Sequence, residues 1–185
     1  MAKVYVFLAD GFEEVEGLTV VDLLRRAGED VEMVSIMGRK QITGSHNIRV
    51  EADSLFEETG FSGGDLLVLP GGMPGTRYLG AHEGLCRLLG EWNREGKRIG
   101  AICAAPSVLG DLGILEGREA VCYPGFEERL AGARIGNGKV AVDGNITTSR
   151  GVGTAIAFAA ALIEQLESKE KAEEIKKSII YGHFS

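Results

Sequence analysis

The sequence predicts an α/β fold in which a mainly parallel sheet is covered by helices on both faces. Short apolar runs without polar alternation recur along the chain, which is typical of strands buried on both sides. Segments with apolar residues at helical spacing lie between these runs. Strands that alternate with helices form parallel sheets, and such sheets place their sites at the carboxyl ends of the strands.

The composition is that of a globular protein, and we expect one domain over residues 1–185. Hydrophobic residues make up 44% of the chain and charged residues 25%. The net charge of -7 and the lack of a Lys/Arg-rich run argue against a nucleic-acid partner. The first apolar run is too short for a signal peptide or a membrane span, so we expect a cytoplasmic protein with no membrane partner.

The first unit of the chain is a strand, a helix and a second strand. Residues 3–9 form a continuous apolar run, which predicts a buried strand. Apolar residues then recur with helical period from Val20 to Ala27, and Gly28 marks the end of this helix. A second strand is predicted over 31–36.

The rest of the chain continues this alternation. Apolar runs predict the strands, segments of helical period predict the helices, and Asp143-Gly144 is a typical hairpin turn. In order, the predicted elements are a hairpin over 41–52, a strand over 65–69, a helix over 83–95, a strand over 98–102, a helix over 104–112, a strand over 119–123, a hairpin over 139–148, and helices over 154–167 and 168–180.

Cys103 stands where the strand over 98–102 gives way to a helix. A thiol at such a corner faces the partly positive N-terminus of the helix, which favours the nucleophilic thiolate. We therefore predict that Cys103 is reactive. The alternative is a buried cysteine that packs as a small hydrophobic residue, which is our interpretation of Cys86.

Three predicted strand ends should meet around Cys103. Residues 11–16 follow the first strand, Pro70-Gly71-Gly72 follows the strand over 65–69, and Ala104 follows the cysteine itself. Attack by a thiolate on a carbonyl group needs donors for the oxyanion that develops. The backbone N–H groups of Gly72 and Ala104 are placed to supply them.

An acidic cluster lies at the start of the first helix. Carboxylates are stabilised there by the helix dipole, and this accounts for Glu13 and Glu14, which we place in the loop that approaches the helix. Glu16 lies four residues before Val20 and so shares the inward stripe of the helix. A carboxyl group buried beside a thiolate has a raised pKa, so Glu16 is predicted to hold a proton near neutrality and to donate it to sulfur.

Four segments together resemble the ThiJ/PfpI superfamily, and most of all its DJ-one branch. They are residues 10–16 (DGFEEVE), 68–72 (VLPGG), 101–106 (AICAAP) and 148–154 (TSRGVGT), and the resemblance covers nearly the whole chain in order and spacing. It implies a flavodoxin-like three-layer sandwich of the class I glutamine amidotransferase type, usually a homodimer.

The resemblance also implies roles for four residues. Cys103 corresponds to the nucleophile-elbow cysteine, Glu16 to a protonated glutamate, and Gly72 and Ala104 to the oxyanion-hole amides. In this branch the cysteine is readily oxidised to a sulfinate held by the glutamate, which suits an accessible, activated thiol.

Two positions depart from the pattern. Protease-like members carry a histidine directly after the cysteine, where this chain has Ala104, so we disfavour peptidase activity. A member of the DJ-one branch carries a histidine before a proline at the position of Tyr123, and a phenol that is neutral at pH 7 cannot replace imidazole as a base. The role that remains for Tyr123 is to orient the substrate or to form a hydrogen bond with it. The neighbouring Cys122 is either a resolving thiol or buried packing, and packing is favoured.

The resulting hypothesis is a cysteine-dependent enzyme without cofactor, of the glyoxalase III or deglycase type. Its substrates would be methylglyoxal, glyoxal or their early adducts on proteins. The alternative is a non-enzymatic sensor of oxidative stress, or a chaperone-like protein, in which Cys103 is oxidised. An amidotransferase role ranks last, because the sequence offers no histidine for its triad.

No metal site is predicted. The odd number of cysteines includes no Cys-x-x-Cys pair, which argues against both a disulfide framework and a zinc site. None of His46, His82 and His183 has a second ligand at suitable spacing, and all three are expected on the surface. Asp22 and Arg150 are interpreted as a structural ion pair rather than as part of the site.

Overall fold

The computed structural model describes residues 1–182, so the surface position predicted for His183 lies outside the described residues. Within them, one sheet is formed by β1 (Lys3–Leu8), β2 (Asp30–Ser35), β5 (Ser54–Leu55), β6 (Leu66–Leu69), β7 (Arg98–Ile102), β10 (Val140–Asp143) and β11 (Ile146–Ser149). The strand order is β10-β11-β7-β6-β1-β2-β5. Only β10 runs antiparallel to its neighbour, so the predicted, mainly parallel sheet is confirmed.

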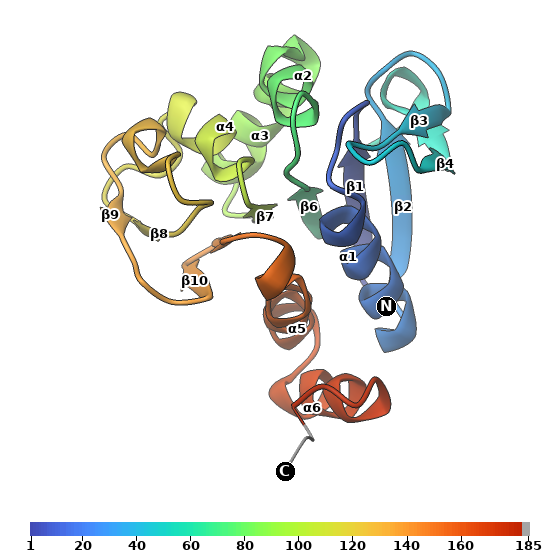
Figure 1. Ribbon diagram of the computed structural model, residues 1–185, viewed down its shortest axis with the longest axis vertical. Coiled ribbons are helices and arrows are strands. Elements are labelled where there is room, and N and C mark those ends of the chain that lie inside the picture. The colour runs from blue at the N-terminus through green and yellow to red at the C-terminus, as the bar shows by residue number, and fades with distance from the viewer. Residues whose placement is uncertain (183–185) are drawn as a thin grey trace.

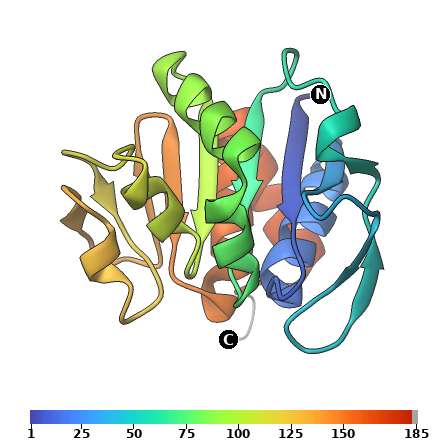
Figure 2. The ribbon, with the colours of Figure 1, turned by 90° about the horizontal axis from the view of Figure 1, so that it is seen from above.

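Helices cover both faces of this sheet, as the sequence predicts. They are α1 (Glu14–Ala27), α2 (Gly75–Ala81), α3 (Glu83–Arg94), α4 (Pro106–Asp111), α5 (Ala155–Leu166) and α6 (Lys169–Ser178). Figure 1 shows α2, α3 and α4 on one side of the strands, and α1, α5 and α6 on the other. The fold is therefore a three-layer sandwich, which the view from above also shows (Figure 2). None of the described helices is long and apolar enough to cross a membrane.

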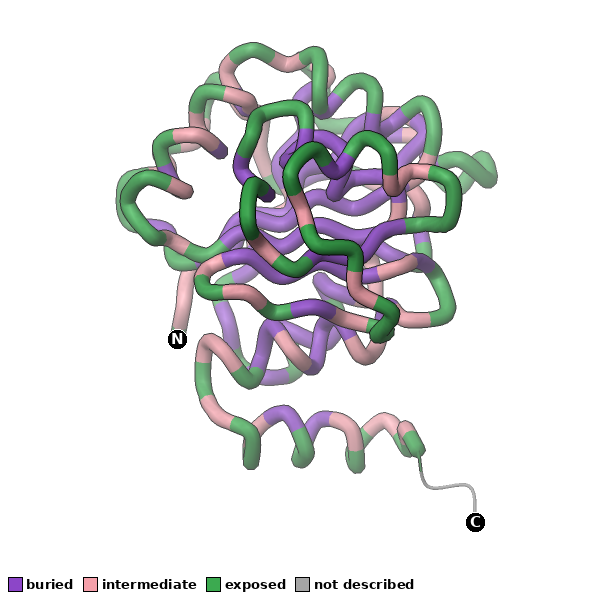
Figure 3. The backbone as a smooth tube through the Cα atoms, turned by 90° about the vertical axis from the view of Figure 1, so that its left-hand side faces the viewer, coloured by how far each residue is buried: buried purple, intermediate pink, exposed green. Residues whose placement is uncertain are grey.

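Each face of the sheet has its own hydrophobic core. Successive side chains of β1 point to opposite faces. Val4 and Val6 therefore pack with α1, α5 and α6, whereas Tyr5 and Phe7 pack with α2, α3 and α4. The strands are buried over almost their whole length, and the exposed residues lie on the outer sides of the helices (Figure 3). A sheet buried on both sides explains why the strands appear in the sequence as continuous apolar runs.

Smaller elements surround the main sheet. The predicted hairpin over 41–52 is confirmed as β3 (Gln41–Thr43) paired with β4 (Arg49–Glu51). The strand predicted over 119–123 is shorter, because only β8 (Glu119–Ala120) forms a ladder, with β9 (Arg134–Ile135). The next amides leave this ladder: Val121 N–H donates to Thr148 Oγ1 and Tyr123 N–H donates to the Cys103 carbonyl. The chain thus turns toward the end of β7.

Helix α2 has no counterpart among the predicted elements. Its sequence, GTRYLGA, contains two glycines and no clear apolar period, so helix propensity and patterning are both weak. The helix begins directly after the loop that follows β6, and Thr76 ties it to that loop by donating from its backbone N–H and its hydroxyl to the Gly72 carbonyl. Helix α2 therefore fixes the loop that ends at the pocket described below.

The close packing of α4 predicts a strong effect for one glycine. A Cβ on Gly110 would lie 2.1 Å from the carbonyl oxygen of Arg129, a backbone atom that cannot yield cheaply. We expect Gly110→Ala to lower the free energy of unfolding by about 2 kcal/mol or more. The matched control is Gly90→Ala in α3, where the added methyl meets only the end of Arg94 at 3.6 Å. This control should gain about 0.5–1 kcal/mol. Urea unfolding measures both, and equal effects of the two substitutions would contradict the packing argument.

Candidate active site

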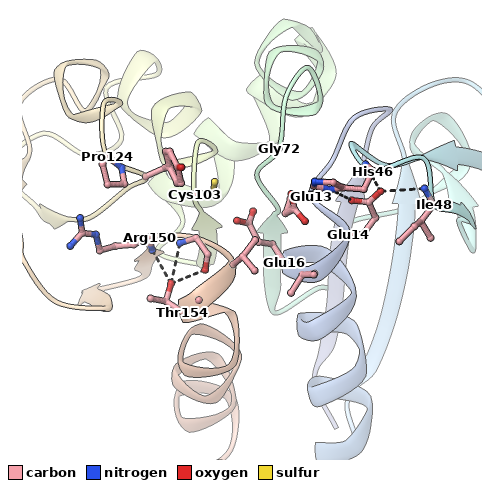
Figure 4. A pocket seen from close by; sticks show the side chains of 15 residues that line it. Glu13, Glu14, Glu16, His46, Ile48, Gly72, Cys103, Pro124, Arg150 and Thr154 are labelled. Carbon is pink, nitrogen blue, oxygen red and sulfur yellow. Dashed lines mark hydrogen bonds and ion pairs between the residues drawn. The ribbon is translucent and has the colours of Figure 1, made fainter.

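A pocket of about 820 Å³ opens at the carboxyl ends of the central strands. It is shown in Figure 4 and is lined by Glu13, Glu14, Val15, Glu16, His46, Ile48, Gly72, Cys103, Tyr123, Pro124, Arg150, Gly151, Val152, Gly153 and Thr154. The strand ends therefore bring Cys103, Glu16 and Gly72 together, as the sequence predicts, and Tyr123, singled out by the family resemblance, lines the same pocket. Ala104 lies directly behind the cysteine and is buried.

Cys103 occupies a strained corner between β7 and α4. Its φ is +66°, in the left-handed region that residues with a side chain rarely adopt. Its N–H donates to the carbonyl of Ser149 at the end of β11, and its carbonyl accepts from Tyr123 N–H. Such a turn is the geometry of a nucleophile elbow, which presents the side chain at the end of the sheet.

Glu16 is fully buried and faces Cys103 from the first turn of α1. Its Oε2 accepts a hydrogen bond of 2.9 Å from Gly71 N–H, whereas Oε1 accepts none from the described residues. Burial, assisted by the charge of Glu13, raises the pKa of Glu16 to about 7, although the contacts with Cys103 and Gly71 act in the opposite direction. Glu16 therefore holds a proton near neutrality, as predicted from its inward position.

Gly71 makes the approach of these two side chains possible. A Cβ at this position would lie 2.5 Å from Cys103 Cβ and 2.6 Å from Glu16 Oε2. Any other residue would push the thiol and the carboxyl group apart. The same loop is bound to the start of α1, because Glu13 N–H donates to the Gly71 carbonyl. The close-packed glycine thus fixes the ends of β6, β7 and α1 with respect to one another.

The thiol itself is less acidic than the sequence suggests. Burial, the charge of Glu16 and contact with its carboxyl group raise the pKa of Cys103 to about 12, whereas the N–H groups of Gly72 and Ala104 lower it. The expectation of a thiolate favoured by a helix N-terminus is thus wrong in direction, because α4 begins only at Pro106 and is short. Burial is the largest cause of this shift, and the charge of ionised Glu16 adds to it. The two groups are therefore coupled: once Glu16 has titrated they share one proton, and a thiolate forms when that proton sits on the carboxyl group.

Tyr123 and Arg150 line the opposite wall of the pocket. Tyr123 is 51% exposed, and its ring lies beside Gly151. Arg150 follows β11, and its guanidinium points away from Cys103 (Figure 4). Within the described chain Asp22 pairs with Arg26 one helical turn later, at 2.7 Å, and not with Arg150, so an ion pair of Asp22 and Arg150 near a dimer interface stays a prediction. Asp22 and Arg26 are four residues apart on one helix, so their side chains are neighbours as soon as the helix forms.

The role of Glu14 does not follow from the sequence. It is not in an approach loop but in the first turn of α1, and it is 3% exposed. Its Oε1 accepts from the N–H groups of His46 and Ile48, and its Oε2 accepts from Ser45 Oγ at 3.2 Å. Burial alone would raise the pKa of Glu14, but these donors hold it below its usual value. Glu14 therefore fastens the turn between β3 and β4 to the start of α1, and this turn forms a wall of the pocket.

His46 was also placed only on the surface by the sequence. Its side chain is 68% exposed, so that expectation is confirmed, but the residue also lines the pocket. Potential ligand atoms of Glu13, Glu14 and His46 lie within 4.8 Å of one another, a spacing compatible with a metal ion. The carboxylate of Glu14 is already saturated by donors from the hairpin turn, however, so this grouping is explained without a metal.

The other two cysteines lie away from the pocket. Cys122 is 3% exposed and packs in the core beneath α2, α3 and α4, whereas Cys103 contacts the core on the opposite face of the sheet. Burial raises the pKa of Cys122 to about 11. Cys86 in α3 is partly buried, and its Sγ lies 3.4 Å from the Gly80 carbonyl. These surroundings fit the packing roles favoured from the sequence.

The family relationship agrees with this geometry. The sequence model of the DJ-1/PfpI family matches residues 2–165, and Drosophila melanogaster dj-1beta is 34% identical over 96% of both chains. The chain belongs to the DJ-1/PfpI family. The resemblance identified from the four sequence segments is thereby confirmed.

Two further relatives place the chain within the DJ-1/PfpI family. The solved structure of oxidized Toxoplasma gondii DJ-1 is 37% identical, with a TM-score of 0.95 and coverage of 98% of this chain and 100% of that one. A Pyrococcus abyssi protein named a deglycase is 33% identical over 89% of this chain and 99% of its own. The chain spans less than half the length of two Arabidopsis thaliana DJ-1 homologs, each 39% identical to it.

The raised pKa of Glu16 predicts a pH-dependent cost to stability. Stability contributed by the protonated carboxyl group is present in full below the ordinary value of 4.5 and is lost as the pH rises through about 7. Glutamine mimics the protonated form at every pH. We expect Glu16→Gln to match the wild type near pH 5 and to exceed it by about 2–3 kcal/mol near pH 8.5. Urea unfolding at the two pH values measures this difference, and a constant difference between the two proteins would contradict a raised pKa.

Proposed function

We propose that this DJ-1/PfpI protein is a cysteine-dependent, cofactor-free enzyme of the glyoxalase III or deglycase type. One observation carries the proposal: a fully buried carboxyl group with a free oxygen faces a thiol, and both lie at the floor of an open pocket. A pair that shares one proton can both activate sulfur and move protons on a bound carbonyl compound. The Pyrococcus abyssi relative named a deglycase supports this class of reaction.

The proposed steps use only groups in the pocket. The Cys103 thiolate attacks the aldehyde carbon of the substrate, and the N–H groups of Gly72 and Ala104 stabilise the oxyanion, which then takes the proton from Glu16. The Glu16 carboxylate removes the proton from this carbon and returns it to the neighbouring carbon through an enediol. Water then hydrolyses the resulting thioester: Glu16 takes a proton from the attacking water and passes it to the leaving sulfur. Methylglyoxal and water would thus give lactate and one released proton.

The proposed reaction steps do not require a histidine in the pocket. Tyr123 occupies the wall where the family resemblance suggests a histidine, and its hydroxyl can orient a bound oxygen. Glu16 serves in turn as acid and as base because its pKa of about 7 lies close to the working pH. One tuned carboxyl group therefore performs both proton transfers.

The size of the pocket favours substrates larger than a free dicarbonyl. A volume of about 820 Å³ greatly exceeds that of a three-carbon aldehyde. Val15, Ile48 and Val152 stand at the pocket wall with about half of their surface exposed. Such a rim suits the apolar stem of a protein side chain that carries an early carbonyl adduct.

A second candidate is a sensor of oxidative stress. The donors from Gly72 and Ala104 and a protonated Glu16 would hydrogen-bond the oxygens of a Cys103 sulfinate as well as a reaction intermediate. The oxidized Toxoplasma gondii DJ-1 structure shows that a close relative has been solved in an oxidized state. Under this reading the pocket recognises an oxidation product, and turnover is absent.

We further propose that the chain forms a homodimer through part of the rim of the pocket, so that the opening itself stays accessible to substrate and solvent. Four apolar side chains there are about half exposed, namely Val15, Ile48, Tyr123 and Val152. Sedimentation velocity should show a dimer that Val15→Lys weakens, because a charge in an apolar interface is costly. The matched control is Val142→Lys on β10, whose side chain is similarly exposed but does not line the pocket. A monomeric wild type would contradict this proposal.

The enzyme reading predicts lactate formation from methylglyoxal without added thiol or metal. We expect turnover in the wild type, and its loss to the uncatalysed background in both Cys103→Ser and Glu16→Gln, because each removes one member of the proton-sharing pair. Lactate is measured enzymatically, with Cys86→Ser as a control outside the pocket that should retain activity. A fully reduced wild type with no turnover on methylglyoxal or on a glycated peptide would reject the enzyme reading. Oxidation of Cys103 by peroxide, followed by mass spectrometry, would then test the sensor.

A further inference from the structure

His46 joins the pocket from a part of the chain that carries none of the expected chemistry. It lies in the turn between β3 and β4 and lines the same pocket as Glu13, Glu16 and Cys103. Exposure falls along this row of titratable groups: the His46 side chain is 68% exposed, that of Glu13 is 14% exposed, and Glu16 is fully buried. The imidazole thus stands at the solvent end of a series that ends at the thiol.

The contacts hold the imidazole over two carboxylates. His46 Nδ1 lies 3.1 Å from Glu14 Oε2 and 3.5 Å from Glu13 Oε2. The hydroxyl of Ser45 lies 3.0 Å from the same nitrogen and 3.3 Å from Glu13 Oε2, so it bridges the pair. Because the backbone N–H of His46 also donates to Glu14, the base of the side chain is fixed and the ring cannot drift far from Glu13.

Glu13 in turn acts on the floor of the pocket. Its carboxyl group lies between Glu16 and His46 in Figure 4, and its charge disfavours ionisation of Glu16. The charged and titratable groups around this row are few. Glu16 is faced by Glu13 and Cys103, His46 by Glu13 and Glu14, and Arg150 and Tyr123 line the far wall. His46 is therefore the group best placed to compensate the charge of Glu13.

We propose that His46 is a positioning residue of this pocket, whose imidazolium offsets the charge of Glu13 and so sets the pH at which the pair of Glu16 and Cys103 loses the first of its two protons. While His46 is charged, a negative charge on the pair is less unfavourable. When His46 becomes neutral, Glu13 is uncompensated and the pair keeps its proton to a higher pH. The inference deepens the proposed function, because it concerns the same pair, but it does not depend on turnover.

The charge of His46 acts on Glu16 through Glu13, which makes the coupling measurable. The contact with Glu14, followed by the charge of Glu13, raises the pKa of His46 above its ordinary value of 6.5. A permanently neutral and a permanently charged side chain at this position bracket the wild type.

The test is the pH dependence of Cys103 alkylation by iodoacetamide, followed at the Cys103 peptide by mass spectrometry. We expect His46→Gln to raise the midpoint of the rate profile by about half a pH unit and His46→Arg to lower it. The matched control is Arg49→Gln, which removes a cation from the same hairpin but outside this pocket, and its midpoint should stay at that of the wild type. In a Glu13→Gln background, exchange of His46 should no longer move the midpoint.

Two results would overturn the inference. One is a midpoint that is the same in the wild type, His46→Gln and His46→Arg, with thermal unfolding showing that all three are folded. The other is a shift in Arg49→Gln as large as that in His46→Gln, which would indicate a general effect of surface charge. Shifted midpoints in a protein that turns over neither methylglyoxal nor a glycated peptide would reject the enzyme reading and support this inference. Turnover with unshifted midpoints would support the enzyme reading and reject this inference.

Discussion

The structure of the pocket depends on the close approach of three chain segments at one glycine. Gly71 lies in the loop that follows β6, and the space that a side chain would fill there is taken by Cys103, which follows β7, and by Glu16 from α1. These segments can meet because β7, β6 and β1 are neighbours in a parallel sheet, so their carboxyl ends lie at the same edge. The hydrogen bond from Glu13 N–H to the Gly71 carbonyl closes the arrangement. A displacement of any one of the three strands would separate the thiol from the carboxyl group.

This arrangement has an energetic cost that the rest of the fold offsets. A non-glycine residue in the left-handed region and a carboxyl group without contact to water each cost free energy on their own. Both sit between strands that are buried on two faces, where two hydrophobic cores fix the backbone. The chemistry of Glu16 and Cys103 follows from this burial, because the ionisation of each group changes the pKa of the other. The proton that they share, rather than an acidic thiol, is what the fold provides.

Much of the fold and the centre of the site could be predicted from the sequence, because both follow from local patterns. Apolar runs locate the strands, helical periods locate most helices, and the strand-end rule brings Cys103 and Glu16 together. The sequence did not show α2, whose glycines hide its period, or the burial of Glu14, whose partners lie about thirty residues away in a hairpin turn. The direction of the pKa shift of Cys103 was also predicted wrongly. Burial and a neighbouring charge set this shift, and both depend on distances that the spacing of residues in the sequence does not reveal. The position of His46 at the pocket could not be predicted for the same reason, because it depends on the hydrogen bonds between the β3–β4 turn and Glu14.

The separation of the cysteines across the sheet bears on how long an oxidised state would last. Cys122 is close to Cys103 along the surface of the fold, since the Cys103 carbonyl accepts from the next residue, Tyr123, yet its side chain is turned into the opposite core. A sulfenic acid at Cys103 therefore meets no second thiol of the described chain with which to condense. It must either be reduced by a small thiol that enters the pocket or take up another oxygen atom, and the second step is not reversed by ordinary thiols. If Cys103 is oxidised, the fold would thus favour a lasting change of state over a rapid return to the thiol.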